Sequence, residues 1–197
     1  MSVEPDDLET RPSLLVRVRD ASDNEAWRRF VGVYGRLILA DCRRRGLKWD
    51  EAEDVAQQVL TRVFQSLRSF EYRPDRGRFR DWLGTVVRNE VRRYQKRHQP
   101  RSAVEFLRMD DLADNDPAWN EAFARHILAV ALQECRPHFE PRTWNVFEGV
   151  WIHRKTPSQV AQEFEVPLDW VYVAKSRVLK RVSAIVEELT NDLPLPS

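Results

Sequence analysis

The chain has 197 residues, with 32 Lys and Arg against 31 Asp and Glu, a formal net charge of +1 and 42% hydrophobic residues. That length allows one domain or two small ones with a packed core. No window is apolar over the length of a membrane span, and the amino terminus lacks the pattern of a signal peptide, so we expect no membrane insertion. Cys42 and Cys135 show no motif spacing, which favours a reduced, cytoplasmic setting.

The low glycine content and the absence of long alternating stretches predict an all-α fold. Charge is unevenly distributed: residues 68–101 carry eleven Lys or Arg and four acids, whereas residues 102–124 carry one Arg and six acids. We therefore expect two small helical domains, at 1–98 and 118–197, joined by an acidic linker at 99–117, with a helix-turn-helix in the second domain.

The first domain should hold two long helices before its basic segment. Asp23 is a good N-cap for the first, which Gly46 ends, and Asp50 with Glu53 predicts a capping box that opens the second. The outer face of that second helix is polar and includes Asp54, Gln57, Gln58 and Arg62. From the residues alone, plain solvent exposure is the favoured explanation of this face.

Pro74 and Gly77 break the helical pattern between residues 69 and 78. Arg73, Arg76 and Arg78 occur in this loop beside two aromatic residues, a combination that can hold a phosphate backbone and stack on an unpaired base. The alternative is that the aromatic side chains only cover the core under a surface loop.

An amphipathic helix is predicted from Phe79 to Arg97, where apolar residues recur at three- and four-residue steps. Its polar positions are strongly basic and include Arg88, Asn89, Arg92, Arg93 and Lys96. A helix that is apolar on one side and cationic on the other fits a polyanion. A solvated face is the alternative, although such a face normally mixes both signs of charge.

In the second half, Asp116 and Pro117 start a predicted helix that runs to about Cys135, and Pro141 opens another. Thr156, Pro157 and Gln159 predict a capping box for a short helix, followed by a break at 165–167 and a long basic helix at 168–189. This is the helix-turn-helix pattern, and the second helix would offer Tyr172, Lys175, Ser176, Arg177 and Lys180 to DNA. A helix pair without a DNA role could look similar.

Two segments together resemble a known family. EAEDVAQQVLTRVFQSLRSF, the basic loop and GRFRDWLGTVVRNEVRRYQKR resemble region 2 of the extracytoplasmic-function (ECF) sigma factors of RNA polymerase. TPSQVAQEFEVPLDWVYVAKSRVLKRV resembles their region 4. The likeness covers roughly residues 13–189, in the order region 2, linker, region 4.

The resemblance implies a role for each polar set. Asp54, Gln57, Gln58 and Arg62 would bind core RNA polymerase. The −10 promoter strand would be held by a set that spans the loop and the basic helix: Arg73, Asp75, Arg76, Arg88, Asn89, Arg92, Arg93 and Lys96. The −35 element would be read by Tyr172, Lys175, Ser176, Arg177 and Lys180. An anti-sigma protein is a further partner that the resemblance suggests.

The leading hypothesis is thus a promoter-specificity subunit that directs transcription initiation. A stand-alone helix-turn-helix regulator is the alternative, but it leaves the polar face around Asp54 and the 69–78 loop unexplained. A helical interaction protein is a third. The four histidines lack metal-ligand spacing, and no phosphate-binding glycine loop or nucleophile elbow occurs, so we expect no enzyme activity, metal, cofactor or small-molecule substrate.

Overall fold

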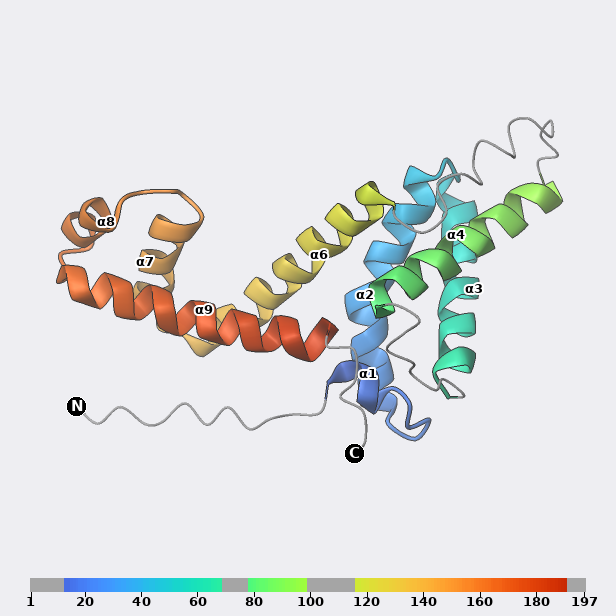
Figure 1. Cartoon of the computed structure of the whole chain (residues 1–197), viewed down its shortest axis with the longest axis horizontal. Coiled ribbons are helices and arrows are strands. Elements are labelled where there is room, and N and C mark those ends of the chain that lie inside the picture. Colours follow the sequence, from blue (N-terminus) through green and yellow to red (C-terminus); the bar gives the residue numbers. More distant parts are fainter. Residues whose placement is uncertain (1–12, 69–77, 99–115, 191–197) are drawn as a thin grey trace.

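The structure is a computed structural model that describes residues 13–68, 78–98 and 116–190. Every regular element in these ranges is a helix, which confirms the predicted all-α fold (Figure 1). The α-helices are α1 (Leu14–Arg17), α2 (Asn24–Arg44), α3 (Trp49–Arg68), α4 (Phe79–His98), α6 (Pro117–Cys135), α7 (Pro141–Trp151), α8 (Pro157–Glu163) and α9 (Leu168–Thr190). A 3-10 turn, Arg136–His138, follows α6.

Helices α2, α3 and α4 pack together in the amino-terminal half. Their shared core is aromatic: Trp27 of α2 meets Phe64 of α3 edge-on at 4.9 Å between ring centroids, and Tyr34 of α2 meets Phe79 of α4 at 5.4 Å. Such edge-to-face pairs add to the stabilisation that burial alone supplies. The buried faces of α2, α3 and α4 therefore hold these helices in fixed relative positions.

The helix ends follow the sequence predictions at α2 but not at α3. Asp23 caps α2 by accepting the amide of Ala26 at 2.8 Å, and Gly46, with φ of +91°, ends it. The predicted capping box of Asp50 and Glu53 is wrong, because α3 begins at Trp49 and Asp50 lies within its first turn. Glu51 takes the capping role instead, since its carboxylate accepts the amide of Lys48 at 2.7 Å.

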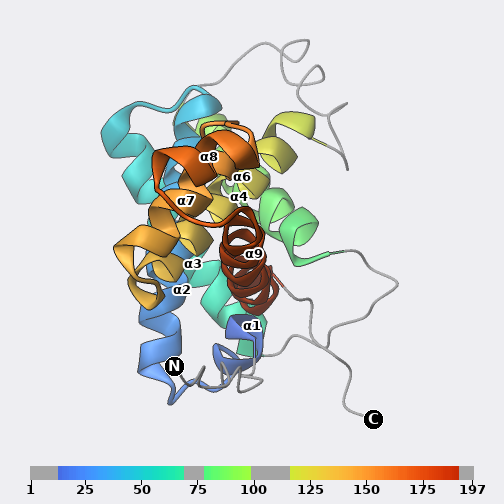
Figure 2. The ribbon, with the colours of Figure 1, turned by 90° about the vertical axis from the view of Figure 1, so that its left-hand side faces the viewer.

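Helices α7 and α8 and the start of α9 form one end of the molecule, which faces the viewer in Figure 2. They enclose a small core of their own, made by Val146, Val160, Val171 and Ala174. The predicted capping box at α8 is confirmed: Thr156 accepts the amide of Gln159, and the Gln159 side chain accepts the amide of Thr156 at 2.9 Å. This fixes the start of the short helix that precedes α9.

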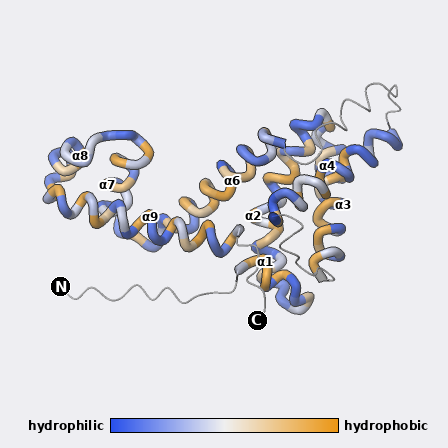
Figure 3. Tube along the Cα trace, in the orientation of Figure 1, coloured by the Kyte–Doolittle hydropathy of each residue, from blue (hydrophilic) through white to orange (hydrophobic). Residues whose placement is uncertain are grey.

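The two halves share one hydrophobic core, because α6 packs against α2 and α4, and α9 packs against α1. The Tyr34 hydroxyl donates to the carbonyl of Leu189 at 2.5 Å, and the Trp119 indole donates to the carbonyl of Arg80 at 2.9 Å. The apolar segments of α2 and α6 accordingly lie toward the middle of the molecule in Figure 3. We refer to this contact between the halves as the seam.

Trp119 approaches α4 closely because residue 84 is glycine. A Cβ atom at Gly84 would lie only 2.6 Å from the Trp119 Nε1 atom and 2.9 Å from Cδ1. Real Cβ atoms do not come this close to other atoms, so the indole occupies space that any other residue at this position would fill. The fit of α6 on α4 therefore depends on Gly84.

Ion pairs surround the apolar seam. Arg29 of α2 binds Glu134 of α6 at 2.8 Å and also binds Glu188 of α9. At the start of α6, the Asp116 carboxylate accepts from Arg44 at 2.7 Å and from Arg45 at 2.8 Å. Charged contacts thus reinforce the seam at both ends of α6.

Asp116 also caps α6, through the amide of Trp119. Burial acts to raise the pKa of its carboxyl, but the hydrogen bonds from Arg44 and the Trp119 amide outweigh this, so the pKa lies below its ordinary value. The carboxylate is therefore charged at neutral pH and can form ion pairs with both arginines.

Cys42 and Cys135 are both buried within the helical core. Burial raises the pKa of the Cys42 thiol to about 12, which leaves almost no reactive thiolate at neutral pH. We assign Cys42 a packing role.

Candidate nucleic-acid interface

The outer face of α3 presents a short polar surface. Asp54 is exposed on this surface, and Gln57 and Gln58 are exposed one turn farther along, as the spacing predicted. The buried side of the same helix is filled by Ala52, Val55, Val59 and Val63. The exposed residues are therefore not needed to pack α3.

Arg62 lies at the end of this surface but also has a structural contact. Its guanidinium binds the Glu90 carboxylate of α4 at 2.5 Å, and Glu90 is only 3% exposed. Arg93 binds the same carboxylate at 3.2 Å from the next turn of α4. A buried acid that lost these partners would be costly. Arg62 therefore stabilises the contact between α3 and α4, whereas Arg93 holds the same carboxylate from within α4.

Fewer residues of the basic face of α4 are exposed than the sequence indicated. Asn89 and Lys96 are exposed, Arg93 is about half exposed, and Arg92 is partly buried. Arg88 differs from the expectation that it faces DNA: it is 9% exposed, and its guanidinium donates to the Thr85 hydroxyl at 3.2 Å. The open part of the face therefore lies toward the carboxy-terminal end of α4.

The other residues expected at the −10 strand, Arg73, Asp75 and Arg76, lie outside the described residues. Arg78, the last residue of the predicted loop, is described and exposed. It directly precedes α4, so the predicted loop leads into the start of the basic helix.

The second candidate surface is the exposed side of α9. Val171, Ala174, Val178 and Val182 face inward at three- and four-residue steps. Tyr172, Ser176, Arg177 and Lys180 are exposed on the opposite side, as expected, whereas Lys175 is partly buried beside the packed face. Four of the five residues expected at the −35 element thus share one accessible side of α9.

Val173 also lies on this side, with 53% of its surface exposed, although the sequence interpretation did not include it. Its position could have been predicted, because residues 171, 174 and 178 form the buried stripe and leave 173 outside it. The interpretation concentrated on polar and basic residues and therefore missed an apolar one.

The turn before α9 has a fixed geometry. Arg142 of α7 donates to the carbonyls of Phe164 and Glu165 at 2.9 and 3.3 Å, and its guanidinium lies 6.0 Å from the centre of the Trp170 ring. Glu165 adopts the left-handed conformation, with φ of +49°, which allows the sharp reversal between α8 and α9. The side chains at the start of α9 are therefore held in place by α7.

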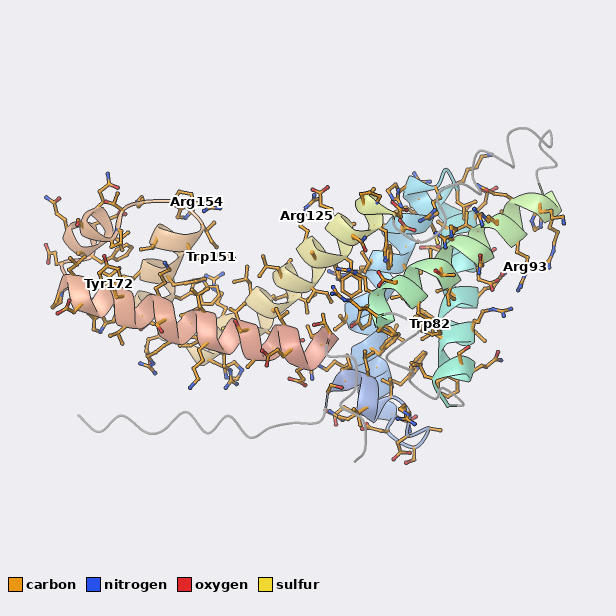
Figure 4. All side chains as sticks on the ribbon, viewed as in Figure 1. Trp82, Arg93, Arg125, Trp151, Arg154 and Tyr172 are labelled. Atoms are coloured by element: carbon orange, nitrogen blue, oxygen red, sulfur yellow. The ribbon has the colours of Figure 1, made fainter. Side chains whose placement is uncertain are left out.

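The two candidate surfaces lie at opposite ends of the molecule. Figure 4 shows Arg93, on α4, near one end of the long axis and Tyr172, on α9, near the other. Within the described residues, no cluster of histidine, cysteine or acidic side chains could hold a metal ion. No helix in the described ranges has the length and apolar character that crossing a membrane requires.

Comparison with known proteins assigns one part of the chain. Residues 30–101 match the family model described as Sigma-70 region 2. No curated protein matches the sequence significantly. One solved structure, that of CnrH in complex with the cytosolic domain of CnrY, aligns with 88% of this chain and 95% of its own chain at 20% identity. The TM-score of this alignment is 0.36.

The matched segment holds most of α2 and all of α3 and α4. It therefore contains both the polar surface of α3 and the basic face of α4. Residues 30–101 are similar to sigma-70 region 2.

Proposed function

We propose that this chain is a promoter-specificity (sigma) subunit that binds core RNA polymerase and directs transcription initiation. The match of residues 30–101 to sigma-70 region 2 carries the proposal. Two features of the described residues support it: an exposed polar surface on α3 that packing does not require, and an open basic end on α4.

In this proposal Asp54, Gln57 and Gln58 contact the polymerase, and Arg62 contributes while also holding Glu90. Asn89, Arg92, Arg93 and Lys96 follow the −10 strand, together with Arg73, Asp75 and Arg76, which lie outside the described residues. A cationic surface of this kind binds the phosphate backbone without sequence preference, so base selection in the melted strand falls to the predicted loop.

The exposed side of α9 reads the −35 element in the same proposal. The supporting features are the short helix α8, the fixed turn, and a longer helix whose outer side carries Ser176, Arg177 and Lys180. In a helix-turn-helix, the second helix lies in the major groove with its amino-terminal residues at the base edges. Tyr172 and Lys175 complete the set expected from the sequence.

The test is reconstitution with core RNA polymerase. We expect the purified chain to form a stable complex with core and to support run-off transcription from a subset of a genomic promoter library. The variant Gln57→Ala with Gln58→Ala should compete poorly for core, because it removes two exposed amides from the centre of the α3 surface. Gln65→Ala is the matched control, since Gln65 is an exposed glutamine farther along the same helix.

Each outcome has a clear meaning. Normal competition by the double variant would remove the polymerase contact from this part of α3. Failure of the unmodified chain to bind core, combined with tight binding to free duplex DNA, would support the stand-alone regulator instead.

A further inference from the structure

The first two turns of α9 carry a cluster of exposed apolar side chains. Five large hydrophobic residues are strongly exposed in the described part of the chain, and three of them are Leu168, Tyr172 and Val173. Single exposed apolar residues are normal on a protein surface, but a group of three on two helical turns indicates a contact with another molecule. The residues lie outside the packed face of α9, so core packing does not explain them.

Val173 stands next to polar and basic residues on the same side of the helix. Ser176 and Arg177 lie one turn farther along, Lys180 lies a further turn away, and all three are exposed. Two cations beside an apolar side chain fit a polyanion that also presents an apolar group. They do not favour a purely apolar protein surface, where buried charges would lose their hydration.

The position of Val173 is set by the fold. Val171, two positions before it, and Ala174, the residue after it, are 1% and 3% exposed within the core of α7, α8 and α9. Arg142 holds the preceding turn through two carbonyl groups. A side chain anchored in this way loses little conformational freedom on binding, which is what recognition of a single base requires.

A valine side chain ends in two methyl groups and can make no hydrogen bond. In the major groove of DNA, the only apolar group on a base edge is the C5 methyl group of thymine. We infer that Val173 contacts the C5 methyl group of one thymine in the upstream promoter element and thereby selects that base. This inference rests on the proposed function, because it requires α9 to lie in the groove.

The test removes the methyl group from the DNA and the valine from the protein, separately and together. Each thymine of the upstream element is replaced in turn by deoxyuridine, which keeps all hydrogen-bonding groups. With the unmodified protein in complex with core polymerase, we expect promoter affinity to fall about fourfold at one position, the change that corresponds to burial of one methyl group. Val173→Ala should bind the thymine promoter less tightly and should not distinguish thymine from deoxyuridine at that position.

Ile152→Ala is the matched control, because Ile152 is a similarly exposed aliphatic residue that lies outside α9. It should keep the difference between thymine and deoxyuridine. Equal affinity of the unmodified protein for all deoxyuridine promoters would overturn the inference, and so would a thymine preference that Val173→Ala retains.

The same experiment separates the inference from the function on which it rests. If the unmodified protein supports run-off but shows no methyl dependence, only the role of Val173 fails. If it yields no run-off product with core polymerase on any promoter, the proposed function fails and takes the inference with it. Loss of core binding in Val173→Ala would place the apolar cluster against the polymerase.

Discussion

The contact between Gly84 and Trp119 allows a sharp test of the seam. Gly84→Ala places a methyl group on α4 at a point 2.6 Å from the Trp119 Nε1 atom. The indole must move, although Trp119 is only 3% exposed and its N–H group donates to the carbonyl of Arg80. The substitution therefore overpacks the seam and breaks a buried hydrogen bond.

Three effects combine in the expected change. Overpacking a core costs about 1–3 kcal/mol, and the lost hydrogen bond costs about 1 kcal/mol. Replacing glycine by alanine inside a helix returns about 1 kcal/mol. The free energy of unfolding of Gly84→Ala should therefore fall by about 2 kcal/mol, which far-UV circular dichroism during urea denaturation measures well.

The sign of the effect should reverse when the indole is absent. In a Trp119→Ala background, Gly84→Ala meets no ring and should raise the free energy of unfolding by about 1 kcal/mol, through helix propensity alone. Gly32→Ala on α2 is the control, since a Cβ atom there meets nothing within 4 Å and should have the same small effect in both backgrounds. If Gly84→Ala were stabilising in both backgrounds, Trp119 would not lie against α4 in solution.

Three further predictions concern the basic face of α4, the turn before α9 and the start of α6. Lys96→Ala should reduce the slope of log promoter affinity against log salt concentration by about 0.7 to 0.9, the share of one phosphate contact. Arg125→Ala, on α6 (Figure 4), should leave this slope unchanged. Equal slopes for both variants would argue against a phosphate contact on the basic face of α4. Glu165→Gly should raise the free energy of unfolding, measured in urea, by up to about 1 kcal/mol, because glycine adopts a φ of +49° without steric cost. A decrease would mean that contacts of the Glu165 side chain stabilise the fold. Asp116→Asn should destabilise the chain at pH 7 and progressively less below about pH 4. The reason is that folding lowers the pKa of this carboxyl, so the carboxylate stabilises the fold above its unfolded pKa and loses this effect as the pH falls. A pH-independent difference in urea denaturation would contradict the charge pairing.

The helices themselves could be predicted from local patterns. Asp23, Asp116 and Thr156 cap the helices expected of them, since each cap depends only on residues three positions away. The predicted box at Asp50 failed because Glu51 accepts the Lys48 amide, while Glu53 accepts the indole N–H of Trp49 instead of a backbone amide. The basic character of α4 was likewise visible in the sequence.

Contacts between distant segments could not be predicted in this way. Arg88 was assigned to the DNA face because of its charge, yet it is largely buried beside Thr85. Glu90 is the only acid between residues 82 and 98 of this basic helix, and its partners are Arg62 of α3 and Arg93. The contact of Arg62 with Glu90 depends on how α3 and α4 pack, which no spacing within one helix determines.

The seam also sets a geometric condition on the proposed function. From Tyr172 to Leu189, α9 extends about 26 Å, and α4 extends about as far from Phe79 to Lys96. With about 10 Å for each of the two helix contacts that link them through Tyr34, the backbone at Tyr172 and the backbone at Lys96 lie at most about 70 Å apart. Promoter positions −35 and −10 are about 85 Å apart along B-form DNA.

We therefore expect a chain that bridges both elements at once to open the seam, in which case the energy that holds the halves together would oppose promoter binding. Gly84→Ala should then have opposite effects in two assays: it lowers the free energy of unfolding, but it maintains or raises run-off transcription with core polymerase. Gly32→Ala, which leaves the seam intact, should change neither in this direction. If run-off instead fell in proportion to stability, the packed arrangement of the halves would be the one that functions on the promoter.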